Sequence, residues 1–261
     1  MGRWDLDIVE RMQDGPVMII TGGSRGIGAA TARLAARRGY VVCVNYLSGR
    51  EAAEEVVAAI TMEGGRAIAM QADVSVEGEV ESLFRRVDAE LGSVVALVNN
   101  AATLETQMRV EAMDAARMAR MFAVNAVGPM ICAREAMRRM STRHGGRGGA
   151  IVNVSSGAAK YGSAGEYVDY AASKGAIETF TIGLAKEVAE EGIRVNAVRP
   201  GFIYTGFHAK GGEPGRVDRV KTLVPMQRGG EPEEVAQAIL WLLSPEASYT
   251  TGSILDVAGG R

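Results

Sequence analysis

Cysteine, histidine, proline and aromatic residues are scarce in this sequence of 261 residues. It contains two cysteines, two histidines and seven prolines, and aromatic residues make up 5% of the chain. Cys43 and Cys132 lie far apart in apolar surroundings, a placement typical of buried free thiols rather than of a disulfide or a metal framework. No cluster of histidine, cysteine and acidic residues has the spacing of metal ligands, so we expect no metal site.

Charge of one sign and long apolar runs are also lacking. The 29 basic and 31 acidic side chains give a net charge of −2, which argues against a nucleic-acid partner. The longest uncharged stretch, residues 91–104, is too short and too polar to span a membrane. The first residues, MGRWDLDIVERMQD, carry acidic side chains where a secretory signal needs an apolar core. We therefore expect a cytoplasmic protein without a membrane partner.

Glycine, in contrast, is abundant. The chain has 33 glycines without the every-third-residue period of a fibre, and its hydrophobic share of 47% and charged share of 23% are those of a globular protein. A chain of this length can bury a large core. No Pro/Ser-rich linker, repeat or low-complexity segment divides it, so we expect a single domain over residues 1–261.

Short apolar runs rich in β-branched residues alternate with longer segments of helical period. The expected strands are residues 17–20, 41–45, 67–71, 94–99, 151–154, 194–198 and 253–257. The expected helices are residues 27–38, 51–63, 80–91, 108–139, 170–190 and 232–243, with a candidate break at Gly128-Pro129 in the fourth. This alternation predicts an α/β fold, a doubly wound sheet of about seven mostly parallel strands with helices on both faces.

The least regular stretch is residues 205–230, which contains HAKGGEPGR. It favours a mobile substrate loop with a short helix, and the alternative is an ordinary surface excursion.

A glycine-rich turn follows the first expected strand in VMIITGGSRGIGAATARLAARRG. At this place in a doubly wound sheet, Gly22, Gly26 and Gly28 would let the backbone approach a pyrophosphate at the helix N-terminus. The spacing is G-x-x-x-G-x-G, and the alternative interpretation is a tight strand-to-helix connection. The strand before the turn and the helix after it favour nucleotide binding.

The second expected strand ends in VVCVNYLSGR, which holds no acidic residue for the ribose hydroxyl of NAD. Arg25 in the glycine turn is a cation that would accept the 2′-phosphate of NADP. We expect NADP(H), with Arg25 as the main contact and Ser48 or Arg50 assisting. The alternative is that Arg25 and Arg50 are solvated surface cations.

Tyr170 and Lys174 are spaced i to i+4, which places both side chains on one face of the expected helix. A nearby ammonium favours the phenolate and lowers the pKa of a tyrosine. Tyr170 would then exchange a proton with a carbonyl or alcohol oxygen, while Ser156 at the end of the preceding strand orients that oxygen. The spacing alone is common, and it is usually structural.

Six separated motifs together resemble the short-chain dehydrogenase/reductase family. They are TGGSRGIG at 21–28, Asp73-Val74, NNAA at 99–102, Asn125, the Ser156, Tyr170 and Lys174 set, and Arg199-Pro200-Gly201. The resemblance runs from about Gly15 to Gly260. It is closest to the classical subgroup, which includes 3-oxoacyl-carrier-protein reductases and bacterial sugar dehydrogenases.

This resemblance implies Tyr170 as the acid–base residue, with Lys174 lowering its pKa and bonding the nicotinamide ribose. Ser156 would position the substrate oxygen, and Asn125 would complete a proton relay through water. Asp73 and Val74 would bracket the adenine. The full set of expected cofactor contacts is Gly22, Ser24, Arg25, Gly26, Ile27, Gly28, Tyr46, Ser48, Asp73, Val74, Asn99, Ala101, Tyr170, Lys174, Pro200, Gly201, Ile203 and Thr205.

Ser156 lies 14 residues before Tyr170, one more than is usual in the family, so Ser155 and Ser156 both stay candidates for the catalytic serine. We expect Tyr167 to pack in a loop, although a functional place next to Tyr170 is the alternative. His208 is either an isolated histidine or one that faces the substrate.

The expected function is an NADP(H)-dependent oxidoreductase that interconverts a secondary alcohol and a ketone of a small molecule. The alternative is a non-catalytic dinucleotide-binding regulator or scaffold. We also expect a homo-oligomer, a dimer or tetramer, formed through the long helices at 108–139 and 170–190.

Overall fold

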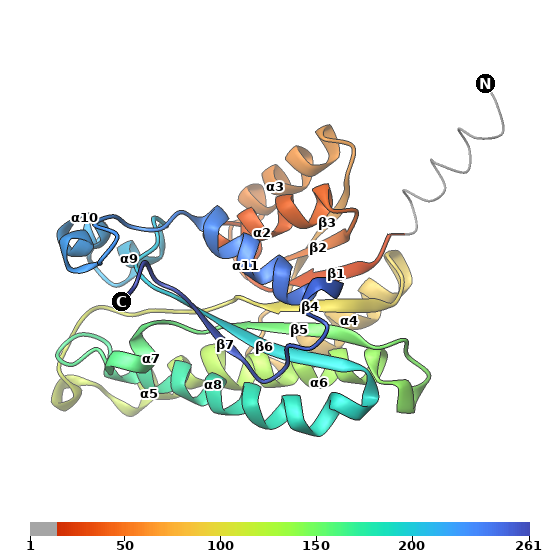
Figure 1. Cartoon of the computed structure of the whole chain (residues 1–261). Helices are drawn as coiled ribbons and strands as arrows, with labels where there is room; N and C mark the ends of the chain where they lie inside the picture. The colour runs from red at the N-terminus through yellow and green to blue at the C-terminus, as the bar shows by residue number, and fades with distance from the viewer. Residues whose placement is uncertain (1–14) are drawn as a thin grey trace.

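The computed structural model describes residues 15–261, in which seven strands form one sheet (Figure 1). Every strand pair is parallel, and the order across the sheet is β3-β2-β1-β4-β5-β6-β7. The strands are β1 Val17–Ile20, β2 Val41–Tyr46, β3 Arg66–Gln71, β4 Val94–Asn99, β5 Gly149–Val154, β6 Ile193–Pro200 and β7 Ile254–Val257. The seven expected strands and the doubly wound α/β fold are confirmed.

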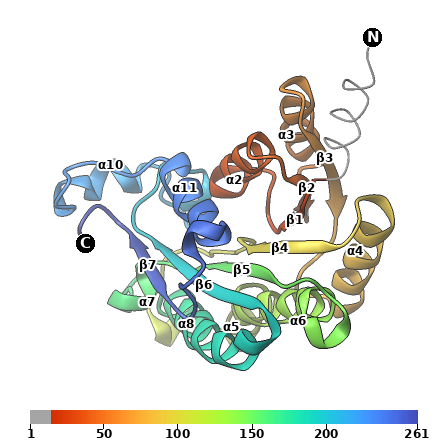
Figure 2. The same cartoon turned by 45° about the vertical axis from the view of Figure 1, so that its right-hand side comes forward.

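Helices cover both faces of the sheet, as Figures 1 and 2 show. α2 (Gly26–Arg37), α3 (Arg50–Met62) and α11 (Pro232–Leu243) pack on one face. α4 (Glu77–Glu90), α6 (Gly128–Met140) and α8 (Val168–Val188) pack on the other. The shorter helices are α5 Ala115–Phe122, α7 Ala158–Tyr161, α9 Phe207–Lys210 and α10 Arg216–Val220.

The core lies in two apolar layers, one on each side of the strands. All four residues of β1 are buried, which explains its uninterrupted apolar run, because a parallel strand is covered on both faces. Cys43 and Cys132 belong to the layer under α4, α6 and α8, where both are free thiols. Burial raises the pKa of each thiol to about 12. The prediction of buried free cysteines is confirmed.

The segment expected as one helix over residues 108–139 is divided. Asp114 accepts a hydrogen bond from the Arg117 backbone N–H at 2.6 Å, and this cap starts α5 at residue 115. A π-helical turn, Ala123–Val127, then joins α5 to α6. The predicted start at Met108 is therefore wrong, and the irregularity precedes Gly128-Pro129. Pro129 follows the π-helical turn directly within this continuous helix, and because proline has no N–H it donates no hydrogen bond to the preceding turn.

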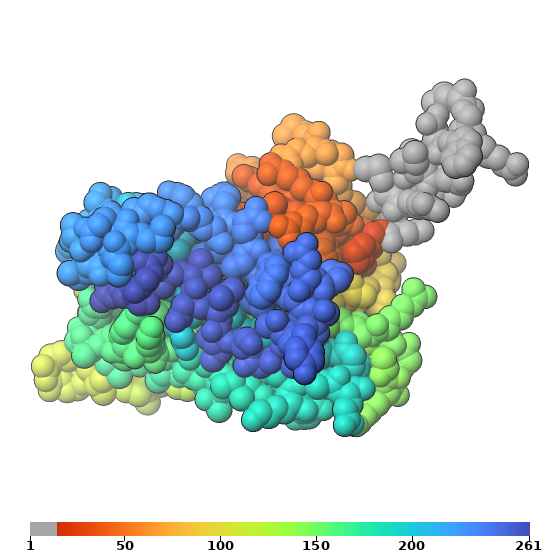
Figure 3. Space-filling model, viewed as in Figure 1, coloured from red at the N-terminus to blue at the C-terminus, as the bar shows by residue number. Residues whose placement is uncertain are grey.

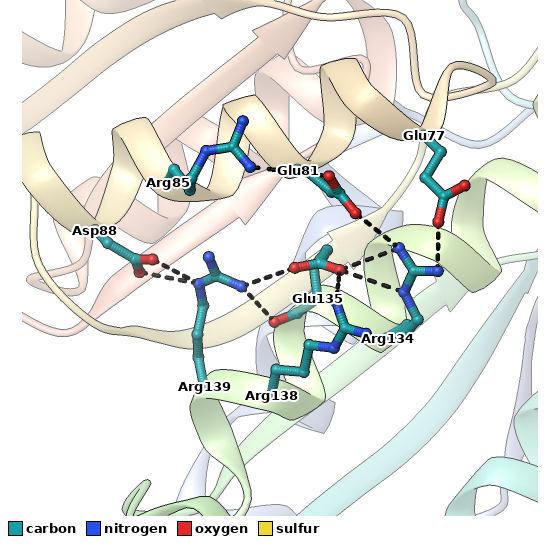
Figure 4. A network of polar contacts seen from close by, with 8 residues as sticks. All are labelled: Glu77, Glu81, Arg85, Asp88, Arg134, Glu135, Arg138 and Arg139. Carbon is teal, nitrogen blue, oxygen red and sulfur yellow. Dashed lines mark hydrogen bonds and ion pairs between the residues drawn. The ribbon is translucent and has the colours of Figure 1, made fainter.

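A network of ion pairs fastens α6 to α4 (Figure 4). Arg134 contacts Glu77 at 2.6 Å and Arg139 contacts Asp88 at 2.8 Å. Between them, the nearly buried Glu135 accepts hydrogen bonds from both arginines. These ion pairs offset the free-energy cost of burying the negative charge of Glu135.

The strand order reverses between β1 and β4, so their crossover connections leave in opposite directions and open a crevice at the carboxyl ends of the strands. Residues 205–230 contain α9 and α10 rather than one short helix. Within residues 15–261, we find no helix with the length and apolar character that crossing a bilayer demands.

Candidate active site

A cavity of about 630 Å³ occupies the crevice at the carboxyl ends of the strands. It runs from the glycine turn, past the ends of β4 and β5, to α9, α10 and the end of the chain. Its volume lies within the range of about 300 to 1,000 Å³ found for ligand pockets. The expected catalytic tyrosine and most of the expected cofactor contacts meet here.

The glycine turn at one end of this cavity has the shape that an anion needs. Gly22 and Gly26 have φ values of +61° and +52°, and a Cβ on Gly22 would lie 2.9 Å from the Ala101 Cα. No side chain caps the N-terminus of α2, and its first turn holds no acidic residue. Free N–H groups therefore face the cavity, an arrangement that fits a pyrophosphate. Gly28 lies behind this lining, where a Cβ would meet the Gly22 carbonyl oxygen.

Arg25 reaches from the glycine turn to the loop after β2. A Cβ on Gly49 would lie 2.7 Å from an Arg25 guanidinium nitrogen, so this side chain passes directly over that loop. Ser48 lines the cavity beside it, whereas Arg50 pairs with Glu54 at 2.6 Å and is largely exposed. Of the two residues expected to assist Arg25, Ser48 is at the cavity and Arg50 is not.

Lys210 of α9 is a second cation at this end, and sequence reasoning did not assign it to the cofactor. Burial, together with the charge of Arg25, lowers its pKa. Both cations line the cavity, and neither has a carboxylate partner among residues 15–261. Nothing in the sequence indicated that residue 210 folds back toward residue 25.

The NNAA segment does not sit as expected. Asn99 is buried below the cavity, where its amide donates to the Pro129 carbonyl at 3.1 Å and to Asn153 Oδ1 at 2.9 Å. The next residue, Asn100, lines the cavity and donates to the Gly22 carbonyl at 2.9 Å, which braces the glycine turn. The expectation that Asn99 lines the cleft is therefore not met, while Ala101 does line it.

Asp73 and Val74 line the same side of the cavity, after β3. Asp73 also accepts hydrogen bonds from the backbone and hydroxyl of Ser75, which shape the turn into α4. The other expected contacts that line the cavity are Ser24, Ile27, Tyr46, Pro200, Gly201, Ile203 and Thr205.

Tyr170 and Lys174 project from the first turns of α8 into the middle of the cavity. The Lys174 ammonium donates to the Val154 carbonyl at 2.8 Å and lies 5.8 Å from the centre of the Tyr170 ring. Burial lowers the pKa of Lys174 to about 8 and raises the pKa of Tyr170 to about 12. The expected lowering of the tyrosine pKa by Lys174 is not seen here, because the ammonium bonds the strand and burial penalises the phenolate.

Ser156, rather than Ser155, faces the tyrosine. The Ser156 hydroxyl favours the Tyr170 phenolate and so acts against the effect of burial on the pKa of Tyr170. The Ser155 hydroxyl instead donates to Glu178 at 2.7 Å. Both serines line the cavity, and these contacts favour Ser156 as the candidate catalytic serine.

Asn125 lies in the π-helical turn, buried next to the cavity. Its Oδ1 accepts from the Thr103 N–H at 2.7 Å, and its amide donates to the Thr103 carbonyl at 3.0 Å and to Ser173 at 3.3 Å. These bonds hold the loop after β4 against α8. The side chain makes no direct hydrogen bond to Lys174 in the described chain.

The far wall of the cavity comes from residues 205–230 and the loop before α8. Phe207 contacts the Tyr170 ring at a centroid distance of 5.8 Å, and His208 lines the cavity beside it. Tyr167 is almost fully buried and accepts a hydrogen bond from the Gln107 amide at 2.9 Å, as loop packing requires, and it also lines the cavity together with Tyr170. Residues 205–230 thus form part of the site rather than an ordinary surface excursion.

Comparison with known proteins gives matches along most of the chain. A family model described as Enoyl-(Acyl carrier protein) reductase matches residues 22–261. An uncharacterized oxidoreductase of Escherichia coli (strain K12), YgfF, is 59% identical, over 94% of this chain and 99% of that protein. The cis-4-hydroxycyclohexanecarboxylate dehydrogenase of Sinomonas cyclohexanicum is 39% identical, over 94% and 95% of the two chains.

Among solved structures, a short-chain dehydrogenase/reductase from Serratia marcescens has a TM-score of 0.86 at 33% identity, covering 95% of this chain and 98% of that one. The fold and the glycine-lined crevice define a doubly wound protein of the dinucleotide-binding class. With these matches, the chain belongs to the short-chain dehydrogenase/reductase family. It is an oxidoreductase of that family, whose members use a nicotinamide dinucleotide.

Proposed function

We propose that this protein interconverts a secondary alcohol and a ketone with NADP(H), and that Tyr170 is its acid–base residue. The observation that carries the proposal is the placement of three side chains in one cavity. Tyr170, Ser156 and Lys174 all line this cavity, Ser156 favours the Tyr170 phenolate, and the buried Lys174 ammonium lies over the Tyr170 ring. The relative from Sinomonas cyclohexanicum is named for the oxidation of a ring alcohol, which supports the same reaction type.

In the direction of reduction, the substrate oxygen accepts hydrogen bonds from Tyr170 and Ser156. The nicotinamide ring supplies the hydride when it is bound. As negative charge develops on the substrate oxygen, Tyr170 transfers its phenolic proton to that oxygen, and the Ser156 hydroxyl, which favours the phenolate, stabilises the charge left on Tyr170. Oxidation runs the same steps in reverse, with Tyr170 accepting the proton. Asn125 supports the site by fixing the Thr103 loop to α8.

NADP rather than NAD is proposed because of the charges at the end of β2. Arg25 lies over this loop with Ser48 at its side, and residues 45–48, which line the cavity at the end of β2, include no carboxylate that would hold a free ribose hydroxyl. Asp73, which also lines the cavity, follows β3 instead. Lys210 adds positive charge at the same end.

We also propose that the protein forms a homo-oligomer. Its location in the cytoplasm stays a prediction.

Replacing Tyr170 with phenylalanine tests the proposal. The variant loses only the hydroxyl, so turnover should fall by roughly 10² to 10⁴, the contribution of acid–base catalysis, while NADPH affinity stays close to that of the wild type. Turnover is measured by NADPH absorbance with a panel of ketones, and affinity by fluorescence titration. Unchanged turnover would remove Tyr170 from the mechanism. A wild type that binds NADPH but turns over no carbonyl compound would favour the non-catalytic regulator.

A further inference from the structure

Arg261 lies at the substrate end of the cavity without an anionic partner. Its guanidinium carbon is 4.9 Å from the centre of the Phe202 ring and 5.2 Å from that of Tyr161. One terminal nitrogen, Nη1, is buried and has no hydrogen-bond partner in residues 15–261. A buried N–H group without a partner is uncommon and costs stability, so it points to a ligand that is bound in the working protein.

The neighbouring Arg216 provides the contrast. It also stacks on Phe202, at 5.6 Å, but its guanidinium pairs with Glu166 at 3.0 Å and with Glu213 at 2.9 Å. Its charge is therefore compensated within the protein. The charge of Arg261, in the same cavity, is not paired with a carboxylate of residues 15–261. Arg216 is therefore part of the cavity wall, whereas Arg261 is available to bind an anion.

The path from Tyr170 to Arg261 is lined by rings. Phe207 follows Tyr170 at 5.8 Å, His208 follows Phe207 at 6.4 Å, and Phe202 follows His208 at 6.5 Å. Burial and the charge of Arg216 lower the pKa of His208, which makes it a neutral part of this wall at pH 7. A ring-lined path thus runs through the cavity from the proton-transfer group Tyr170 to the cation Arg261.

The end of the chain is held in place by residues 205–230. The Met226 N–H donates to the Gly259 carbonyl at 3.1 Å, and a Cβ on Gly260 would meet Pro225. In Figure 3 the last residues, in dark blue, lie between this loop and the green region of α7. Arg261 is therefore positioned by two segments distant in sequence, rather than projecting freely into solvent.

We propose that the substrate carries a carboxylate at the end opposite to its carbonyl or alcohol group, and that Arg261 binds this carboxylate. The planar guanidinium fork matches a carboxylate in two parallel hydrogen bonds, and stacking on two rings fixes its plane. An apolar body between the two polar ends would fill the ring-lined path. This inference rests on the proposed function, because it concerns the substrate of the same site.

Two pairs of probes test the inference, each an anionic acid and a neutral amide of nearly the same size and shape. They are 4-acetylbenzoate against 4-acetylbenzamide, and 4-oxopentanoate against 4-oxopentanamide. Binding to the full chain is measured by calorimetry with NADP⁺, which cannot reduce the ketone, and turnover is measured separately with NADPH. At least one acid should bind about 10- to 100-fold more tightly than its amide. In the turnover assay, the acid should have a lower KM than its amide and a similar kcat.

Arg261→Gln should remove this preference by weakening the acid while leaving the amide within about twofold, and Arg261→Lys should retain part of it. The control is Arg147→Gln, which removes an exposed cation just before β5, at the amino ends of the strands and so opposite to the cavity. Its acid preference should stay that of the wild type. Equal binding of acids and amides by the wild type, or an unchanged preference in Arg261→Gln, overturns the inference.

The two measurements separate this inference from the proposed function. A carboxylate preference in binding that depends on Arg261, without turnover of any probe, would support the anion site and count against the proposed reaction. Turnover of acid and amide alike would support the reaction and overturn the anion site.

Discussion

Arg25 occupies the N-cap position of α2, but its side chain caps nothing and extends over the loop after β2. A cation placed there without a carboxylate partner suits a phosphate on the ribose. Arg25→Ala should therefore weaken NADPH binding by about 10- to 100-fold, the share of a charge-assisted hydrogen bond, and change NADH binding by less than about twofold. Fluorescence titration of both cofactors gives the two dissociation constants.

Arg50 supplies the matched comparison for Arg25. It begins α3, directly after the loop that the Arg25 side chain lies over, but its guanidinium pairs with Glu54 outside the cavity. Arg50→Ala should leave the affinity for NADPH within about twofold of the wild type. Equal loss of NADPH and NADH affinity in Arg25→Ala would show that Arg25 binds a group that both cofactors share.

At the scale of elements, a buried ion pair joins α5 to α8 next to the catalytic tyrosine. Arg117 Nε contacts Asp169 at 2.7 Å, and both side chains are 3% exposed. Arg117 also donates to the Thr106 carbonyl at 2.7 Å, and Asp169 accepts from the Tyr170 N–H at 2.9 Å. The pair thus fixes the start of α8, from which Tyr170 projects.

Breaking this pair should be costly, because one partner would be left charged and buried. Asp169→Asn is expected to lower the free energy of unfolding by about 3 to 5 kcal/mol, measured by urea denaturation. The double variant Arg117→Met/Asp169→Leu removes both charges and should recover a large part of that loss. A single variant within about 1 kcal/mol of the wild type would mean that the pair is not essential to the position of α8.

The spacing of apolar residues predicted most strands and helices correctly, but it did not predict that the helix expected over residues 108–139 is divided. β1 and β4 were predicted with their observed bounds, because a strand buried on both faces reads as a continuous apolar run. The π-helical turn Ala123–Val127 was missed, since one turn of altered pitch leaves apolar residues on the buried side. Asp114, a capping residue type, was the available signal for the start of α5.

Some residues of the site were likewise predicted from the sequence, and others were not. Tyr170, Lys174 and the glycine turn follow from spacing within one segment, so the sequence predicted their meeting. Asn99 and its neighbour Asn100 differ only in which side of the strand end they face, and a motif match does not distinguish them. Arg261 belongs to no motif and reaches the cavity only because the chain end packs under residues 224–226.

At the scale of the whole molecule, three apolar side chains remain exposed along α5, the π-helical turn and α8. They are Phe122, Val127 and Ile182, with exposed fractions of 37%, 47% and 39%. We refer to them as the α5/α8 patch. The helices that carry it are those expected to form the interface of a homo-oligomer, and in a two-fold dimer the same patch would face itself.

A charge placed in the α5/α8 patch should therefore separate the subunits. In Ile182→Arg, two like charges would meet near the two-fold axis of an apolar interface, which disfavours association. Sedimentation velocity at micromolar concentration should give two or four times the chain mass of 27.6 kDa for the wild type and a smaller species for the variant. Met62→Arg is the control, since Met62 is 82% exposed on α3, in the opposite helical layer. A monomeric wild type, or an Ile182→Arg variant of unchanged mass, would place any interface elsewhere or remove it.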